Sequence, residues 1–155
     1  KKTEREVTML SASGRDIKPC YGCDGCLYKT YGKCVVRDDM DEFISAIKES
    51  RILIFTSPLM WGGFSYDIKK VIDKIAIIGN RFYHIRNSEI VKGIMCDVKK
   101  IAGVAVGGNT SNRQTFDFLL REMGTIMDIK YAAKAIDKSI TDEEIEELAE
   151  EVISL

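Results

Sequence analysis

Residues 51–63 read RILIFTSPLMWGG, a short apolar run followed at once by a loop that contains two glycines. A nearly continuous apolar run of this length is typical of a strand that is covered on both faces of a parallel sheet. Residues 101–106, IAGVAV, form a second run of this kind, and the glycine-containing loop 107–110 (GGNT) follows them. The two runs therefore predict two buried strands of an α/β fold.

Helical patterns lie between and after these strands. The first combines a two-aspartate start with apolar residues at helical spacing: Asp38, Asp39, Met40, Phe43, Ile44 and Ile47. Further helices are predicted after Ser65, over 112–123, and after Thr141, where Thr141 and Glu144 form a capping-box pattern. Strands are also predicted over 6–11 and near 126–135, with irregular segments over 14–37 and 79–97. This alternation predicts one domain, 1–155, built on a doubly wound parallel sheet with helices on both faces.

Ligands of such sheets bind at the edge where the parallel strands end. The loops 57–63 and 107–110 both follow strands, so we expect them to lie on that edge. The irregular segment 14–37 follows the strand expected over 6–11, and the same reasoning places it there. Three loops of unusual composition are thus predicted to meet on one rim of the sheet.

Four cysteines crowd into the segment 14–37. They are Cys20, Cys23, Cys26 and Cys34, with the spacing C-x2-C-x2-C-x7-C. Sulfurs repeated at every third residue of a glycine-containing loop can converge on one compact centre, which favours thiolate ligation of a 4Fe-4S cluster. Structural zinc is one alternative, although zinc sites normally pair two short C-x2-C turns across a longer gap. Free thiols packed beneath the loop are the other alternative.

The composition excludes several classes of partner. The 155 residues carry 23 basic and 24 acidic side chains, a net charge of -1, so we expect no nucleic-acid partner. No apolar stretch approaches the roughly 20 residues of a membrane span, so we expect no membrane partner. Five cysteines, an odd number, argue against a disulfide framework and favour a reducing, cytoplasmic location. We interpret Cys96 as an isolated core or surface thiol, and the only histidine, His84, as a surface residue.

Residues 17–74 resemble the flavodoxin-like family of iron–sulfur flavoproteins and NADPH-dependent FMN reductases. The first matching stretch joins the cysteines to the helix start behind them: Ile17, Pro19, Cys20, Gly22, Cys23, Cys26, Gly32, Cys34, Asp38, Asp39 and Met40. The second surrounds the first glycine loop: Ser57, Pro58, Trp61, Gly62, Ser65, Lys69 and Asp73. Two positions depart from the family pattern, because Met60 stands where an aromatic residue is usual and Lys74 where an arginine is usual.

The resemblance implies a flavodoxin-like fold that binds FMN. It implies flavin contacts from the first glycine loop, at Ser57, Pro58, Leu59, Met60, Trp61, Gly62 and Gly63, with Trp61 taking the aromatic role that position 60 lacks. It implies further contacts at Gly107, Gly108 and Asn109, the last by a hydrogen bond to the polar edge of the ring. Relatives of this kind commonly form homo-oligomers, so we expect the same here, with a cluster close to the flavin of a neighbouring subunit.

The amino terminus departs most from the family. Such folds open with a central strand, a phosphate-binding loop and a helix, a unit that needs about 30 or more residues. The strand predicted over 6–11 would match the second strand of the family order 2-1-3-4-5. We therefore expect that the first strand and the phosphate-binding loop are absent from the chain shown, or that another chain supplies the strand.

Together these patterns predict a flavin-dependent electron-transfer oxidoreductase with FMN and a 4Fe-4S cluster bound by the four cysteines. The expected electron donor is a reduced nicotinamide or a ferredoxin-type protein. We identify no catalytic acid–base pair or nucleophile, since the cofactors would carry the chemistry. One alternative is an NAD(P)H-dependent FMN or quinone reductase without a cluster. The other is a non-catalytic assembly module that binds zinc or no cofactor.

Overall fold

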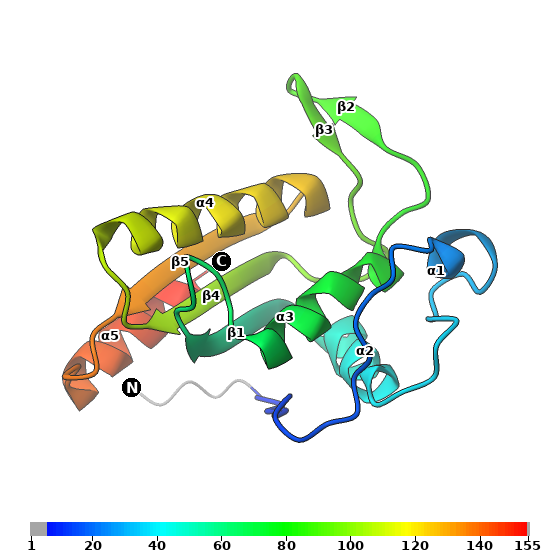
Figure 1. Cartoon of the computed structure of the whole chain (residues 1–155). Coiled ribbons are helices and arrows are strands. Elements are labelled where there is room, and N and C mark those ends of the chain that lie inside the picture. The colour runs from blue at the N-terminus through cyan, green and yellow to red at the C-terminus, as the bar shows by residue number, and fades with distance from the viewer. Residues whose placement is uncertain (1–5, 155) are drawn as a thin grey trace.

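The computed structural model of the chain describes residues 6–154 (Figure 1). Its elements are α1 (Gly25–Tyr28), α2 (Met40–Glu49), β1 (Ile52–Pro58), α3 (Tyr66–Asp73), the 3-10 turn η1 (Lys74–Ile78), β2 (His84–Arg86), β3 (Glu89–Val91), β4 (Lys100–Val106), α4 (Thr110–Met127), β5 (Lys130–Ile136) and α5 (Asp142–Ile153). Strands β1, β4 and β5 form a parallel sheet in the order β1-β4-β5. The predicted α/β class and the parallel sheet are confirmed.

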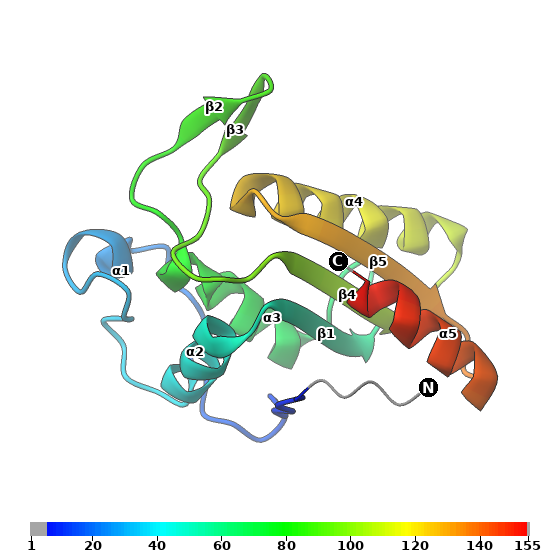
Figure 2. The same cartoon turned by 180° about the vertical axis from the view of Figure 1, so that it is seen from behind.

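Helices cover both faces of this sheet, with α4 and α5 on opposite sides (Figures 1 and 2). Gly103 of β4 lets α4 approach closely, because a Cβ added there would lie 2.7 Å from the Phe116 ring. On the other face, the buried Lys100 Nζ donates to the backbone carbonyls of Glu151 and Ser154, at 3.3 and 3.0 Å, at the end of α5. The arrangement is the doubly wound one that the sequence predicted.

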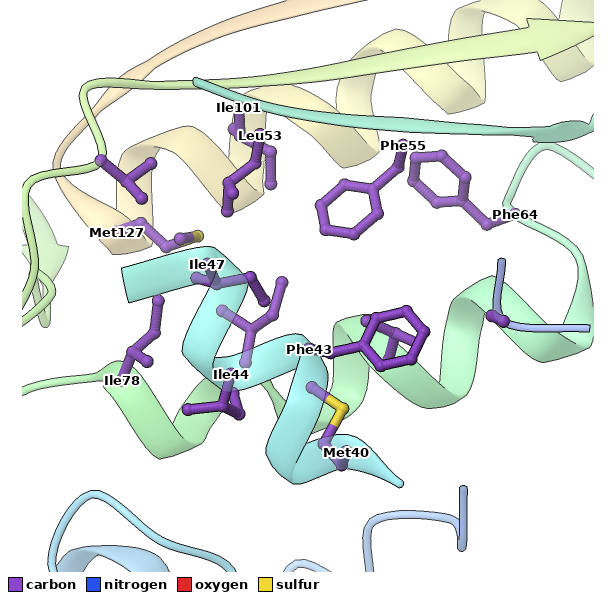
Figure 3. Close-up of a cluster of buried hydrophobic side chains, with 14 of the residues drawn as sticks. Met40, Phe43, Ile44, Ile47, Leu53, Phe55, Phe64, Ile78, Ile101 and Met127 are labelled. Atoms are coloured by element: carbon purple, nitrogen blue, oxygen red, sulfur yellow. The ribbon is translucent and has the colours of Figure 1, made fainter. Parts of the chain in front are cut away.

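The main core lies between α2 and the start of the sheet (Figure 3). All four apolar positions predicted for this helix are buried: Met40, Phe43, Ile44 and Ile47. They face Leu53, Phe55 and Ile101 of the sheet, as the close-up shows. Phe64 extends the same core toward α4, since its ring meets those of Phe55 and Phe116 in edge-to-face geometry. Helix α2 is therefore fixed by its 3.6-residue apolar pattern.

The helices begin within two residues of the predicted positions, although their caps differ. The helix predicted over 112–123 is longer, Thr110–Met127, so residues 126 and 127 are helical and the strand expected near 126–135 is β5, Lys130–Ile136. The predicted capping box of α5 is present, because the Thr141 hydroxyl accepts from the Glu144 N–H and the Glu144 carboxylate accepts from the Thr141 N–H. At α2 the Asp38 carboxylate accepts from the Met40 N–H, while the Asp39 carboxylate bonds elsewhere. No helix within residues 6–154 is long and apolar enough to cross a membrane.

The strand predicted over 6–11 is wrong. These residues have no regular secondary structure and pair with none of the described strands. Val7 and Met9 alternate with polar residues, but both side chains are exposed, so this alternation does not mark a buried face. An alternating pattern becomes a strand only beside a neighbour that accepts and donates its backbone hydrogen bonds, and no described strand lies beside this segment.

A projecting hairpin replaces part of the irregular segment predicted over 79–97. Strands β2 and β3 pair in antiparallel register, His84 with Val91 and Arg86 with Glu89. Asn87 and Ser88 form the two-residue turn, both at positive φ (51° and 65°), as a type I′ hairpin requires. This hairpin was hard to predict from the sequence because the glycine that is usual at the second turn position is absent. Figures 1 and 2 show the hairpin extending away from the sheet.

Candidate functional site

Two of the predicted site loops meet where β1 and β4 end. We call them together the glycine rim, residues 57–63 and 107–110. The Leu59 N–H donates to the Val106 carbonyl at 3.0 Å, and the Gly107 N–H donates to the Ile136 carbonyl at 2.8 Å. Met60 and Gly63 close the first loop by exchanging two hydrogen bonds of 2.9 Å. The rim is thus continuous with the ends of all three parallel strands.

Backbone conformation turns the first loop outward. Trp61 and Gly62 both have positive φ, 54° and 83°. A non-glycine residue in this region is uncommon and is strained by about 1–3 kcal/mol. The result is that the Trp61 side chain is 92% exposed and Met60 is 51% exposed. The loop therefore presents an aromatic plane and a thioether at the rim without covering either.

Two polar residues assigned to the flavin contact bond within the protein instead. The Ser57 hydroxyl donates to the Pro58 carbonyl at 2.9 Å and accepts from the Ser65 N–H at 3.2 Å. The Asn109 side-chain oxygen caps α4 by accepting from the Asn112 N–H at 2.9 Å. Ser57 therefore shapes the loop, and Asn109 retains only its amide NH₂ for a ligand at the rim.

The cysteine loop, residues 14–37, lies at the opposite end of the sheet from the glycine rim (Figures 1 and 2). Its short helix α1 contacts η1, which follows α3 and lies where the strands begin. Lys48, near the end of α2 and close to the start of β1, approaches the Gly32 carbonyl in the same region. The prediction of three loops on one rim is therefore wrong. The loop is placed by its packing on η1 and α2, not by a preceding strand.

Within the cysteine loop, the sulfurs differ in exposure. Cys20 and Cys23 are exposed, whereas Cys26 and Cys34 are half-buried. Burial raises the pKa of Cys26, and the nearby thiols of Cys34, Cys20 and Cys23 raise it further, so all four sulfurs lie in one electrostatic neighbourhood. Among residues 6–154 no three Cys, His, Asp or Glu side chains are arranged to hold a metal ion. The structure therefore places the four predicted ligands in one loop, but their side chains are not in a metal-binding arrangement.

Glycines and aspartates shape the ends of this loop. A Cβ on Gly25 would lie 2.5 Å from Val35 Cγ1, so glycine permits α1 to pack against the returning chain. At the base, the Asp39 N–H donates to the Asp16 carbonyl at 3.1 Å, and the Asp39 carboxylate accepts from the Asp16 N–H at 2.8 Å. The loop is therefore closed by a pair of hydrogen bonds between its two ends.

Cys96 and His84 stand apart from both predicted sites. They border a cavity of about 950 Å³ between the hairpin, the start of β5 and the end of α4. Cys96 is half-buried and packs against the core, and His84 is exposed on β2, as we interpreted them from the sequence. The cavity also includes Arg51, Lys99 and Lys130, which the sequence analysis did not single out.

Comparison with known proteins gives matches that carry a common name. An iron-sulfur flavoprotein of Methanocaldococcus jannaschii is 36% identical over 69 residues, which are 44% of this chain and 35% of that protein. One of Archaeoglobus fulgidus is 38% identical over 76 residues, 49% of this chain and 34% of that protein. One of Methanosarcina thermophila is 23% identical over 109 residues, 70% of this chain and 50% of that protein. Over the aligned residues the chain is similar to these iron–sulfur flavoproteins.

This relationship confirms the resemblance seen in the sequence. The chain spans only about a third to a half of the length of these iron–sulfur flavoproteins. No family model matches the chain. The sequence predicted only a helix start at Asp38 and no role for Lys74, and the structure brings these two side chains together.

Proposed function

We propose that the chain is a flavin-dependent electron-transfer oxidoreductase, with FMN at the glycine rim and a 4Fe-4S cluster at the cysteine loop. One observation carries this proposal: Cys20, Cys23, Cys26 and Cys34 stand in one loop whose two ends are tied together by the hydrogen bonds between Asp16 and Asp39. Relatives named for both iron–sulfur and flavin content support it. Bound here, the two cofactors would supply hydride or single-electron transfer, and the chain would position them.

The cysteine loop suits a cluster in its donor chemistry. Four thiolates are the ligand set of a 4Fe-4S cluster. Thiolates this close together repel one another, so the four sulfurs favour a positive centre that offsets their charge. The positive φ of Gly22 and Asp24, 62° and 51°, bends the chain between the sulfurs. Cys20 and Cys23 are exposed, so they can rotate toward the half-buried pair without opening the core.

The glycine rim suits the ring of a flavin. Trp61 offers an exposed aromatic face, on which a planar ring can stack. Gly107 has a positive φ and open space where a Cβ would stand, so a ligand can approach the backbone there. The rim lies at the ends of parallel strands, where ligands of open α/β sheets bind. Ser57 and Asn109 support these loops from beneath.

The separation of the two sites favours an oligomer. Strand β1 alone has seven residues, which span roughly 20 Å between the two ends of the sheet. A cysteine loop at one end and a glycine rim at the other suit electron transfer between subunits, in which the loop of one copy faces the rim of the next. We therefore propose a homo-oligomer that accepts electrons from a reduced nicotinamide or a ferredoxin-type donor, in a reducing, cytoplasmic location.

The deciding experiment is the visible absorption spectrum of anaerobically purified protein, together with its iron, zinc and flavin content per chain. Flavin bands on a broad absorption that bleaches with dithionite would support the proposal. Flavin without iron would identify the alternative of an FMN or quinone reductase whose cysteines are free thiols. Zinc, or no cofactor at all, would identify an assembly module and overturn the redox proposal.

A matched pair of cysteine variants tests the ligands. Cys23→Ala removes one sulfur of the loop and is expected to abolish iron binding while flavin remains bound. Cys96→Ala removes a half-buried cysteine outside the loop and is expected to leave iron content unchanged. Full iron content in Cys23→Ala would exclude the cluster as assigned.

A further inference from the structure

Asp38 and Lys74 form an ion pair in which both side chains are almost completely buried, with 1% and 2% of their surface exposed. Lys74 opens η1, and Asp38 ends the cysteine loop just before α2. The two residues are 36 positions apart in the chain. Every other ion pair of the described residues has at least one side chain more than 30% exposed, so this pair is unlike the rest.

The Asp38 carboxylate is the junction of three chain segments. One oxygen accepts from the Lys74 ammonium and from the Lys18 N–H, the latter at 2.8 Å. The other oxygen accepts from the Met40 N–H at 3.1 Å. Burial would raise the pKa of Asp38, but these hydrogen bonds outweigh it and leave the pKa lowered. The ionised carboxylate therefore ties the start of the cysteine loop to its end and both to η1.

A buried ion pair often adds little to the stability of a fold. Removing two charges from water costs several kcal/mol per ion in effective terms, and apolar residues of similar volume are often as good or better. Such a pair does determine which chain segments lie together, because a buried charge that is separated from its partner is strongly unfavourable. The two cysteines at the ends of the ligand set lie close to this junction: Cys20 is two residues after Lys18, and Cys34 is four residues before Asp38.

We propose that Asp38 and Lys74 are positioning residues that clasp the base of the cysteine loop and hold Cys20 and Cys34 in register for a shared ligand. We call this ion pair the clasp. The claim that it positions cluster ligands rests on the proposed function. The claim that it orders residues 16–40 does not, because the pair forms with or without iron. Helix α1 adds a second contact to η1, so the clasp fixes the loop against the same turn that carries Lys74.

The test separates positioning from simple loss of folding. Asp38→Ala leaves a buried ammonium without its partner and is expected to fold poorly, so it cannot decide alone. The double variant Asp38→Leu, Lys74→Met replaces both charges by apolar side chains of similar size and is expected to fold. The control double variant Asp73→Leu, Lys69→Met makes the same exchange in the exposed pair of α3 that ends directly before Lys74. Thermal unfolding of all variants reports whether the fold is kept.

Two readouts follow in the variants that fold. Hydrogen exchange over 19–37 in iron-free protein is expected to accelerate at least about tenfold in the Asp38→Leu, Lys74→Met variant, because the loop loses three hydrogen bonds to a charged group. Iron content after reconstitution is expected to fall in the same variant and to stay at the wild-type level in the control.

Normal exchange and normal iron content in a folded Asp38→Leu, Lys74→Met variant would overturn the clasp. If wild-type protein takes up no iron, the proposed function fails, but the exchange comparison still decides the clasp. Normal exchange with lost iron would also overturn it, since the loop would then be held by other contacts.

Discussion

Leu59 packs directly onto Gly108, and this contact joins the two loops of the glycine rim. A Cβ added to Gly108 would lie 2.3 Å from Leu59 Cδ2, closer than any side-chain atom can approach. Gly108 also has a φ of 83°, which other residues rarely adopt. The rim is therefore closed by a contact that only glycine permits.

Gly108→Ala is expected to push the two loops apart and to weaken FMN binding. The overpacking should cost about 1–3 kcal/mol of unfolding free energy beyond the backbone strain. Gly107→Ala is the matched control for stability, because it has a φ of 93° but no atom within 4 Å of the added Cβ. Urea unfolding of both variants checks the difference in stability, and FMN titration of Gly108→Ala checks the loss of affinity. Equal unfolding free energies of the two variants would show that the Leu59 contact does not hold the two loops together.

Trp61 is the only tryptophan of the chain, so its fluorescence reports on the rim alone. FMN binding is expected to quench this fluorescence if the ring stacks on the indole. Trp61→Ala should weaken FMN affinity roughly 2- to 10-fold, the usual value of an aromatic stacking contact. Its stability should change by less than about 0.5 kcal/mol, since the side chain is almost fully exposed. An unquenched tryptophan in FMN-saturated protein would place the flavin elsewhere.

The loop cysteines are expected to react with alkylating reagents in a defined order in reduced, iron-free protein. Exposed Cys20 and Cys23 should be labelled first. Cys26 should lag, because it is half-buried and its raised pKa leaves a smaller thiolate fraction near neutral pH. Raising the pH should reduce the difference in labelling rate between Cys26 and the two exposed cysteines, because Cys26 then ionises. Peptide mapping by mass spectrometry follows each site, and fastest labelling at Cys26 would contradict the arrangement.

Asp38 is expected to make the fold sensitive to acid. Its pKa is lowered in the folded state, so its carboxylate stabilises the fold above the unfolded value of about 3.9. That contribution is lost as the pH falls through the lower, folded-state pKa. Urea unfolding midpoints measured from pH 6 downward should therefore fall less steeply in the Asp38→Leu, Lys74→Met variant, which removes both buried charges, than in the wild type. The Asp73→Leu, Lys69→Met variant, which alters an exposed pair, should keep the wild-type slope.

Several elements could be predicted because their signals are local. The buried stripe of α2, with Met40 and Phe43 at its start, follows from a spacing of three and four residues. The capping box of Thr141 and Glu144 follows from a spacing of three. The apolar runs of β1 and β4 predicted parallel strands. Strand β4 is buried along most of its length, as expected, but the expectation that β1 is covered on both faces is wrong, because Ile54 and every second residue after it are exposed.

Other features were missed because partners distant in the chain decide them. The segment 6–11 has the alternation of a strand, but pairing requires a neighbour that the described residues do not provide. The hairpin of β2 and β3 forms around Asn87 and Ser88, a turn without the usual glycine. The sequence did not indicate that Lys74 is buried, and the packing of η1 against the cysteine loop explains its burial.

The sequence by itself determined that β1 and β4 are parallel strands, which helices flank the sheet and which four cysteines are proposed as ligands. These follow from periodicity, capping and spacing, all of which act over a few residues. Only the tertiary structure decided that the cysteine loop lies at the opposite end of the sheet from the glycine rim, and that Asp38 meets Lys74. The physical reason is that burial and charge pairing across 36 residues depend on how the elements pack, and no local pattern encodes that packing.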